Sequence, residues 1–363
     1  MDRPIAILGG GNAGHCMAAD LTLGGFKVNF YEHPNFKTSF QTTLQTGMVE
    51  IIDVGQAKIH KVTMDMADAL DDVELIMVVI PAMGHELFFN TMLPHLKDGQ
   101  VVTIAPGNFG SLLLSKLLRK KGPDRKITIC EANTMPYATR RVGPARVTLL
   151  YGYGPCKKPR PGRTHVLISA LPARDTELAL RKLQELFPAF SPAQNVLATS
   201  LSNPNLPIHP MGSLLNTGRI EHSNGNFHLY KEGITPSVLR AQRAVFEEIV
   251  MVGEAFGIKV DPITGSASFE DYVGHVMGPN GLYAGILGPK TPKDRYVTED
   301  IPYGVVPTSE MGKKAGMATP LLDALVAIAS VVCQEDYRRT GRTLESLGLD
   351  KLSKEQIISL VKG

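Results

Sequence analysis

The sequence has few of the features that mark a metal-binding, redox-paired or secreted protein. Its 363 residues include only four cysteines, widely scattered and without a C-x-x-C pair, so neither a zinc knuckle nor a redox dithiol is indicated. We therefore expect reduced thiols in a cytoplasmic protein that holds no metal. Aromatic residues make up only 6% of the chain, which is ordinary for an α-rich protein.

Long apolar runs and a strong excess of one charge are also missing. The longest apolar run near the C-terminus, residues 321–333, contains Asp323 and is shorter than the roughly 20 residues of a membrane span. The net charge of +3 favours neither nucleic acid nor an anionic membrane as a partner. A basic run at residues 157–163 is interrupted by prolines and glycine, as in a solvated loop, and no signal peptide precedes the first expected strand.

The first half of the chain alternates strand-like and helix-like segments. A strand at residues 4–8, a helix at 12–24 and a strand at 26–31 are expected to form a βαβ unit. The same alternation continues with apolar strands expected at 74–82, 100–107 and 126–132 and helices at 84–96 and 111–121. Such unbroken apolar runs are typical of parallel strands buried on both faces. The sequence therefore predicts an α/β fold with a Rossmann-type, doubly wound, mostly parallel sheet.

The pattern changes in the second half. Residues 145–152 and 163–171 are expected to be strands that could pair as a hairpin, followed by a helix at 175–187. Strand signals then fade, and long helices with a proline in the first turn are expected at 236–257 and 319–339. We place the domain boundary near residue 198, with residues 1–197 in the α/β domain and residues 198–363 in an all-α C-terminal domain.

The turn between the first strand and the first helix, Gly9-Gly10-Gly11-Asn12-Ala13-Gly14, matches the pattern G-x-G-x-x-G. Gly9 would permit the tight turn, Gly11 the close approach of a pyrophosphate, and Gly14 the close packing of helix on sheet. The helix that begins with Asn12 and Ala13 would offer its first N–H groups to the phosphates. The pattern alone is weak, but its place between a strand and a helix predicts a dinucleotide site.

Glu32 ends the second strand, eighteen residues after Gly14. A carboxylate there accepts hydrogen bonds from the adenosine ribose and repels a 2′-phosphate, so NAD(H) is expected rather than NADP(H). His33 and Lys37 lie nearby and could change that preference. Further cofactor contacts are expected where the next two strands end, at Pro81, Ala82 and Asn108.

His209 is the histidine that stands out, within residues 199–218. Pro210 fits the first turn of a short helix ended by Gly218, which would place His209 at the helix N-terminus, where the dipole disfavours the imidazolium. Such a histidine suits general acid–base catalysis, although a packed or capping histidine gives the same pattern and is more common. Asn205 lies four residues earlier, but two nearby prolines argue against a regular helix between them.

Several segments together resemble the opine dehydrogenases, in the order in which they occur in that family. Beside the glycine turn they are PYATRR (136–141), SNPNLPIHP (202–210), YKEGITPSV (230–238), DRYVTEDIPYGVVPTSEMG (294–312) and GRTLESLGL (341–349). The H-P and R-Y-x-x-E-D segments are the more specific ones. The resemblance covers nearly the whole chain and is close to the octopine and N-(1-D-carboxyethyl)-L-norvaline dehydrogenase type.

The resemblance implies an NAD(P)-binding Rossmann-type domain and a helical catalytic domain like that of 6-phosphogluconate dehydrogenase. The implied reaction joins a 2-oxo acid such as pyruvate to the amine of an amino acid, and hydride from the nicotinamide reduces the imine. His209 and Asn205 match the family's N-x-x-x-H-P segment, and Arg295 and Asp300 match its R-Y-x-x-E-D segment. A homodimer is also expected, because helical C-terminal domains of related folds often dimerise.

These residue types suit the implied roles. Asp300 could hydrogen-bond one ring nitrogen of His209 and fix its tautomer, and Arg295 could grip a substrate carboxylate with its planar fork. Asn205 could orient a carbonyl or carboxylate, whereas an ordinary interdomain ion pair of Arg295 and Asp300 is the alternative. By resemblance, the loop after residues 126–132 borders the substrate, with contacts expected from Thr134 and Arg140, although a surface role for Arg140 is as common.

Two other functions fit parts of the pattern. Ketopantoate reductases, glycerol-3-phosphate dehydrogenases and 3-hydroxyacyl-CoA dehydrogenases also join a Rossmann domain to a helical one, and they deliver hydride to a ketone instead of an imine. They usually place a lysine or a His–Glu pair where this chain has His209. A protein that senses NAD without turnover is the other alternative, and the set of His209, Asp300 and Arg295 argues against it.

Overall fold

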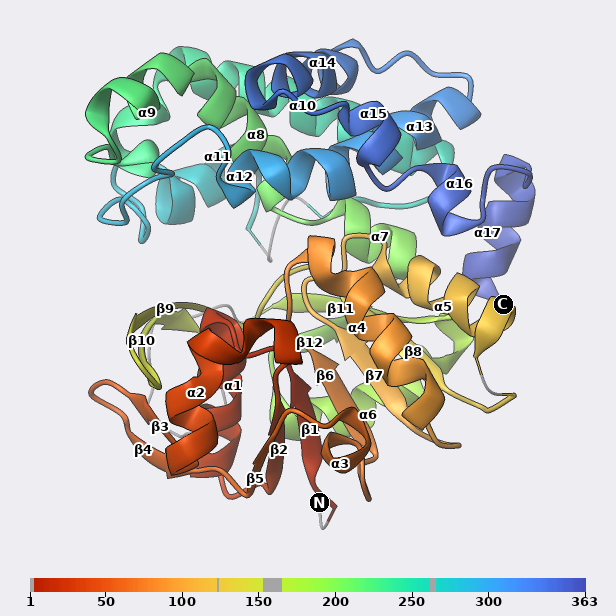
Figure 1. Cartoon of the computed structure of the whole chain (residues 1–363). Helices are drawn as coiled ribbons and strands as arrows, with labels where there is room; N and C mark the ends of the chain where they lie inside the picture. Colours follow the sequence, from red (N-terminus) through yellow and green to blue (C-terminus); the bar gives the residue numbers. More distant parts are fainter. Residues whose placement is uncertain (1–2, 123, 153–164, 262–265) are drawn as a thin grey trace. The chain divides into compact units, whose positions relative to one another are not determined.

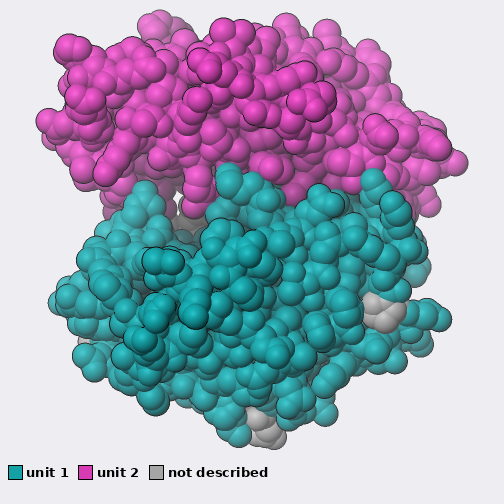
Figure 2. Space-filling model, in the orientation of Figure 1, with its two compact units in different colours: residues 1–199, 361–363 teal, residues 200–360 magenta. Residues whose placement is uncertain are grey.

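The computed structural model describes residues 3–122, 124–152, 165–261 and 266–363. The chain divides into two compact units, residues up to 199 together with 361–363, and residues 200–360 (Figure 2). The division falls two residues after the boundary expected from the sequence. The last three residues, which the sequence analysis placed in the second domain, belong to the first unit.

The first unit is built on an eight-stranded sheet with the order β12-β11-β8-β7-β6-β1-β2-β5 (Figure 1). Every neighbouring pair is parallel except β11 and β8, which are antiparallel. The predicted Rossmann-type, mostly parallel sheet is therefore confirmed. Its strands are β1 (Ile5–Leu8), β2 (Val28–Tyr31), β5 (Lys61–Thr63), β6 (Leu75–Val78), β7 (Val101–Ile104), β8 (Thr128–Ala132), β11 (Val166–Leu171) and β12 (Phe190–Pro192).

A second, four-stranded sheet has the order β4-β3-β10-β9. Its strands are β3 (Met48–Ile51), β4 (Gly55–Lys58), β9 (Tyr137–Gly143) and β10 (Arg146–Gly152). The expected hairpin of residues 145–152 with 163–171 is wrong, because β10 pairs with β9 through a tight turn in which Ala145 has a φ of 52°. β11 is buried along its whole length and lies inside the main sheet instead. The basic run at residues 157–163 lies outside the described residues.

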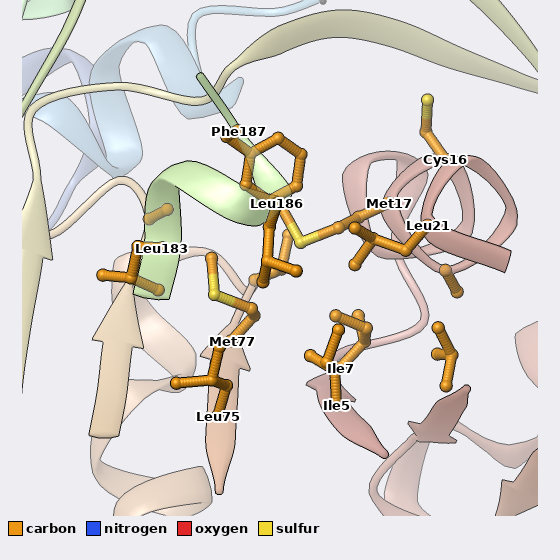
Figure 3. Packing of buried hydrophobic residues seen from close by; sticks show 14 of the residues in the cluster. Ile5, Ile7, Cys16, Met17, Leu21, Leu75, Met77, Leu183, Leu186 and Phe187 are labelled. Carbon is orange, nitrogen blue, oxygen red and sulfur yellow. The ribbon is translucent and has the colours of Figure 1, made fainter. Parts of the chain in front are cut away.

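Helix α1 lies between the two sheets and contacts strands of both (Figure 1). Its apolar residues pack on the main sheet: Figure 3 shows Leu21 above Ile5 and Ile7 of β1 and Met17 extending toward Leu186. Each such fully buried side chain contributes about 1.5–3 kcal/mol to the free energy of unfolding. The helices of this part of the chain are α1 (Asn12–Leu23), α2 (Lys37–Thr46), α3 (Met66–Ala69), α4 (His85–Met92), α5 (Gly110–Lys121), α6 (Thr176–Leu186) and α7 (Val196–Leu201).

The second unit is helical, and its described residues contain no strand, which confirms the predicted all-α character. Helices α8, α10 and α14 contact one another and form its centre. The expected helix at 319–339 is two helices, because Gln334 has a φ of 56° and ends α14. The helices are α8 (Asn205–Leu215), α9 (Thr217–Ser223), α10 (Pro236–Ala255), α11 (Phe269–Tyr272), α12 (Arg295–Thr298), α13 (Val306–Lys314), α14 (Pro320–Cys333), α15 (Tyr337–Thr340), α16 (Leu344–Leu347) and α17 (Lys354–Lys362).

None of the helices in the described part of the chain has the length and apolar character needed to cross a membrane.

Candidate active site

The glycine turn has the geometry that its sequence predicts. Gly9 has a φ of 115°, and a Cβ at Gly14 would lie 1.7 Å from the carbonyl oxygen of Gly9, so both positions need glycine for the fold itself. A Cβ at Gly11 would meet nothing within 4 Å. Gly11 is therefore not required by packing, and the open space before it fits a bound phosphate.

Helix α1 begins at Asn12, directly after Gly11. Gly11 has no side chain to accept hydrogen bonds from the first-turn N–H groups, which suits an anion at this helix end. The side chain of Asn12 instead accepts the backbone N–H of Arg141 at 3.1 Å. The turn and the small sheet are thus joined at the point where α1 begins.

His15 lies beneath the glycine turn, a position that the sequence analysis did not single out. Burial lowers its pKa to about 4, so the ring is neutral at physiological pH. Nδ1–H donates to the carbonyl oxygen of Gly11 at 3.0 Å, and Nε2 therefore accepts from the hydroxyl of Thr43 at 2.8 Å. We interpret His15 as a structural residue that holds the turn.

The carboxylate of Glu32 is bound to the same turn and is only 5% exposed. Oε2 accepts the backbone N–H of Gly10 at 2.8 Å, and Oε1 accepts that of His33 at 2.7 Å. Burial raises the pKa of Glu32, while these two N–H groups and the charge of Arg141 oppose the rise. Glu32 therefore lies at the end of β2 beside the turn, which is where the predicted ribose contact requires it.

Arg141, which was not among the predicted site residues, reaches the glycine turn. Side chains alternate along β9, and Arg140 is exposed, whereas Nη1 of Arg141 donates to the carbonyl oxygen of Gly10 at 3.4 Å. Both arginines lie in the segment PYATRR. The alternation of side chains between the two faces of a strand is the sequence signal that separates their positions. The structure does not test a substrate role for Arg140.

The remaining predicted residues of the first unit follow the carboxyl ends of β6, β7 and β8. Pro81 and Ala82 come three and four residues after β6, and Asn108, with a φ of 48°, precedes α5. Thr134 is buried two residues after β8. The buried carboxylate of Glu131 supports this edge by accepting the N–H groups of Phe109 and Ser111 at 3.3 and 3.0 Å.

His209 lies within α8 and not at its N-terminus, so the expectation based on the helix dipole is wrong. The helix begins at Asn205 and continues to Leu215, and Gly218 belongs to α9. The expected break before His209 is also wrong, because a proline at the third position of a helix lacks only an N–H group that has no intrahelical partner. Asn205 therefore lies one helical turn before His209, on the same face of α8.

The predicted pair of His209 and Asp300 is present in the second unit. Nδ1 of His209 lies 2.9 Å from Oδ2 of Asp300, and the two side chains are only 9% and 6% exposed. Burial raises the pKa of Asp300, and the hydrogen bond from His209 opposes this rise. Since the carboxylate accepts Nδ1–H, it fixes which nitrogen of His209 exchanges a proton elsewhere.

Two tyrosines complete this cluster, and neither was predicted from the sequence to have a role. Nε2 of His209 lies 3.0 Å from the hydroxyl of Tyr230, which in turn donates to the hydroxyl of Tyr296 at 2.9 Å. The rings of His209 and Tyr296 stack with centroids 3.9 Å apart. Both tyrosines lie within quoted segments, but nothing in their spacing distinguishes them from core aromatics.

Arg295 does not pair with Asp300, as the alternative of an ordinary ion pair would require. Its Nε donates to the buried carboxylate of Glu299 at 2.6 Å, and its side chain is 58% exposed. The Nε bond orients the guanidinium, while the exposure leaves the group accessible to a solvent-borne carboxylate.

Together these features define a class: a two-domain dehydrogenase, with a Rossmann-type dinucleotide fold in one unit and a buried His–Asp pair in a helical unit. Residues 192–333 match the family model described as NAD/NADP octopine/nopaline dehydrogenase, alpha-helical domain. An opine dehydrogenase of Arthrobacter sp. (strain 1C) is 33% identical over 372 positions, which cover 99% of each chain.

Two solved structures share the fold along nearly the whole length. An octopine dehydrogenase in complex with NADH and agmatine has a TM-score of 0.72 at 18% identity, over 99% of this chain and 98% of that one. A yersinopine dehydrogenase with NADP⁺ bound has a TM-score of 0.68 at 14% identity, over 99% and 98%.

The chain belongs to the opine dehydrogenase family, which confirms the resemblance drawn from its motifs. The predicted enzyme class, an NAD(P)-dependent oxidoreductase that acts on CH–NH groups, is confirmed with it. The family model's description names both NAD and NADP, so it does not distinguish the two cofactors.

Proposed function

We propose that this enzyme reductively condenses a 2-oxo acid with the amine of an amino acid to give an opine, and catalyses the reverse oxidation. Pyruvate is the 2-oxo acid that we expect. The observation that carries the proposal is the buried pair of His209 and Asp300, with Nδ1 and Oδ2 2.9 Å apart. Both residues lie on the segments that resemble the family most specifically.

The first unit supplies the cofactor site. Gly9, Gly11 and Gly14 shape the turn, and Asn12 and Ala13 begin the helix whose N–H groups suit the pyrophosphate. Glu32 is placed for the ribose, and Pro81, Ala82 and Asn108 follow the strand ends at which such ligands bind. When bound, NADH supplies the hydride.

Glu32 should make the enzyme prefer NADH, because a carboxylate beside the ribose repels a 2′-phosphate. Opposed like charges cost several kcal/mol, so we expect kcat/KM to be at least about tenfold higher with NADH than with NADPH. Glu32→Gln should reduce that ratio, and Glu86→Gln, an exposed carboxylate of α4, should leave it unchanged. Steady-state rates with both cofactors measure it, and a wild-type preference for NADPH would remove Glu32 from the ribose site.

In the second unit, the proton chemistry belongs to His209 and Asp300. In the reductive direction, the protonated imidazole assists the loss of water from the carbinolamine formed by amine and oxo acid. In the oxidative direction, the neutral imidazole accepts the proton of the amine. Asp300 stabilises the imidazolium and keeps the proton of Nδ1 in place. Asn205, one turn earlier on α8, orients a substrate carbonyl or carboxylate.

Arg295 binds a substrate carboxylate. We expect Arg295→Lys to lower kcat/KM by about 10- to 150-fold, which corresponds to the 1.5–3 kcal/mol of one charge-assisted hydrogen bond. The loss should occur although the charge is kept, since lysine lacks the planar fork. Arg243→Lys, which alters an exposed ion pair of α10, is the matched control. An Arg295→Lys enzyme with wild-type kinetics would identify Arg295 as a structural partner of Glu299.

Initial rates test the proposed reaction. Purified enzyme with NADH and pyruvate should oxidise NADH only when an amino acid is added, and a panel of amino acids should identify the preferred amine. A dehydrogenase of the ketopantoate reductase or glycerol-3-phosphate dehydrogenase type would reduce its oxo substrate without any amine. Binding of NADH without turnover on the whole panel would indicate the sensing protein instead.

Three finer features complete the proposal. Thr134 and Arg140 contact the substrate or the nicotinamide, the enzyme acts in the cytoplasm, and two copies form a homodimer. The free thiols of Cys130 and Cys333, both buried, agree with a reducing compartment. Sedimentation analysis of the purified protein tests the dimer.

A further inference from the structure

His209 has no ring nitrogen that faces open space. Nδ1 is bonded to Asp300, Nε2 lies 3.0 Å from the hydroxyl of Tyr230, and Tyr296 is stacked against the ring with an interplanar angle of 9°. A substrate atom cannot reach Nε2 while Tyr230 lies there. While Tyr230 lies there, a proton that leaves or reaches Nε2 passes through the Tyr230 hydroxyl.

The hydroxyl of Tyr230 continues the path. It donates to Tyr296, and since a hydroxyl has a single proton, its oxygen accepts from Nε2–H when His209 is protonated. Tyr230 is only 3% exposed, whereas Tyr296 is only partly buried. A chain of three hydrogen bonds thus leads from the buried carboxylate of Asp300 to a phenol at the surface of the helical unit.

We propose that Tyr230 and Tyr296 relay the proton between His209 and the substrate. The proposal rests on the proposed function, because the proton is the one that this reaction needs. Tyr296 is the group that touches the substrate, and Tyr230 acts through its two neighbours. His209, held by Asp300, remains the source of the proton.

In the reductive direction, the atoms and electrons of this proton transfer balance. Nε2 of protonated His209 gives its proton to the Tyr230 oxygen, Tyr230 gives its own to Tyr296, and Tyr296 gives its own to the leaving hydroxyl of the carbinolamine. The C–O bond breaks with its electron pair on the departing water, and the nitrogen lone pair forms the C=N bond of an iminium. His209 ends neutral, and each tyrosine ends with one proton. In the oxidative direction the transfers along the chain run in reverse, and neutral His209 receives the proton through Tyr296 and Tyr230.

The environment favours a concerted transfer in which neither phenol ionises. Burial raises the pKa of Tyr230 well above the ordinary value of a tyrosine, and the neighbouring Tyr296 raises it further. A phenolate at Tyr230 is therefore a poor intermediate. Instead, each hydroxyl gives up its own proton as it receives another, so both phenols stay neutral.

Tyrosine-to-phenylalanine variants test the relay, because they remove only the hydroxyls. Tyr230→Phe and Tyr296→Phe should each lower kcat by about 10²-fold, the lower end of general acid–base effects, and the double variant should be little worse. Tyr337→Phe, at another buried tyrosine of the helical unit, is the matched control and should stay within about twofold. NADH binding should be unchanged in all of them.

Tyr296→Phe distinguishes a relay from simple positioning. If Tyr230 only held the ring of His209, the Tyr296→Phe enzyme would keep near-wild-type kcat, because the contact of Tyr230 with Nε2 would remain. A plot of single-turnover rate against deuterium fraction should be bowl-shaped for the wild type, since several protons move together. A straight line would indicate a single proton and overturn the relay.

Failure of the relay and failure of the proposed function give different results. A wild-type enzyme that turns over, together with fully active Tyr230→Phe and Tyr296→Phe enzymes, overturns the relay alone. A wild-type enzyme with no turnover on any pair of oxo acid and amine overturns the proposed function, and the relay with it.

Discussion

His209→Ala is expected to lose about 10²–10⁴-fold in kcat, the usual range for removal of a general acid–base group. Asp300→Asn should lose much of the same activity, since the carboxylate 2.9 Å from Nδ1 holds the tautomer and stabilises the imidazolium. The double variant should be little worse than His209→Ala, because residues that act as one unit are not additive. The reductive reaction should be favoured at lower pH and the oxidative reaction at higher pH, because they need opposite protonation states.

The four-member cycle of kcat values measures this, with NADH titrations in parallel. NADH binding should survive in every variant, since neither residue belongs to the unit that carries the glycine turn. If the two losses simply multiply, His209 and Asp300 act separately. If His209→Ala keeps near-full turnover, His209 is a packed histidine of α8.

Gly11→Ala and Gly14→Ala should both abolish tight NADH binding, but for different reasons. At Gly11 a methyl group meets no protein atom within 4 Å, so the fold should be unaffected, and the methyl should displace the pyrophosphate. We expect the Kd for NADH to rise at least about tenfold, or about 1.4 kcal/mol, without a change in Tm. At Gly14 a methyl would lie 1.7 Å from the carbonyl oxygen of Gly9 and should also destabilise the fold by about 1–3 kcal/mol.

Thermal unfolding and NADH titration separate the two effects. Gly218→Ala is the control, since a methyl there also meets nothing within 4 Å and lies in the other unit. An unchanged Kd in Gly11→Ala would show that the phosphates do not approach this turn. A lowered Tm in Gly11→Ala would show that Gly11 has a structural role.

The parts of the fold that the sequence predicts correctly are those set by local patterns. Apolar runs identify the parallel strands, and the glycine turn identifies the βαβ unit that begins the sheet. The partner of β10 is not a local property: a tight turn at Ala145 pairs it with β9, whereas the apolar β11 needs a place in the sheet with both faces covered. The sequence patterns of β9 and β11 would each allow pairing with β10.

For the candidate site, the family resemblance predicts more than the local sequence pattern does. Segment resemblance correctly anticipates the contact between His209 and Asp300, which are 91 residues apart. The predicted place of His209 is wrong, because α8 begins at Asn205, tolerates a proline in its first turn and contains Pro210 in its interior. The roles of Tyr230 and Arg141 were not predicted, because they depend on contacts with atoms distant in the sequence: Nε2 of His209 for Tyr230 and the backbone carbonyl of Gly10 for Arg141.

The mass of the product tests the central claim most directly. Enzyme, NADH, pyruvate and the preferred amino acid should yield a secondary amine whose mass equals the sum of both substrates, minus water, plus two hydrogens. With NADD labelled at the transferred position, one deuterium should appear in that product, on the carbon that was the keto carbon of pyruvate. Deuterated lactate in its place, formed equally well without the amino acid, would show that hydride goes to the ketone and would contradict the account.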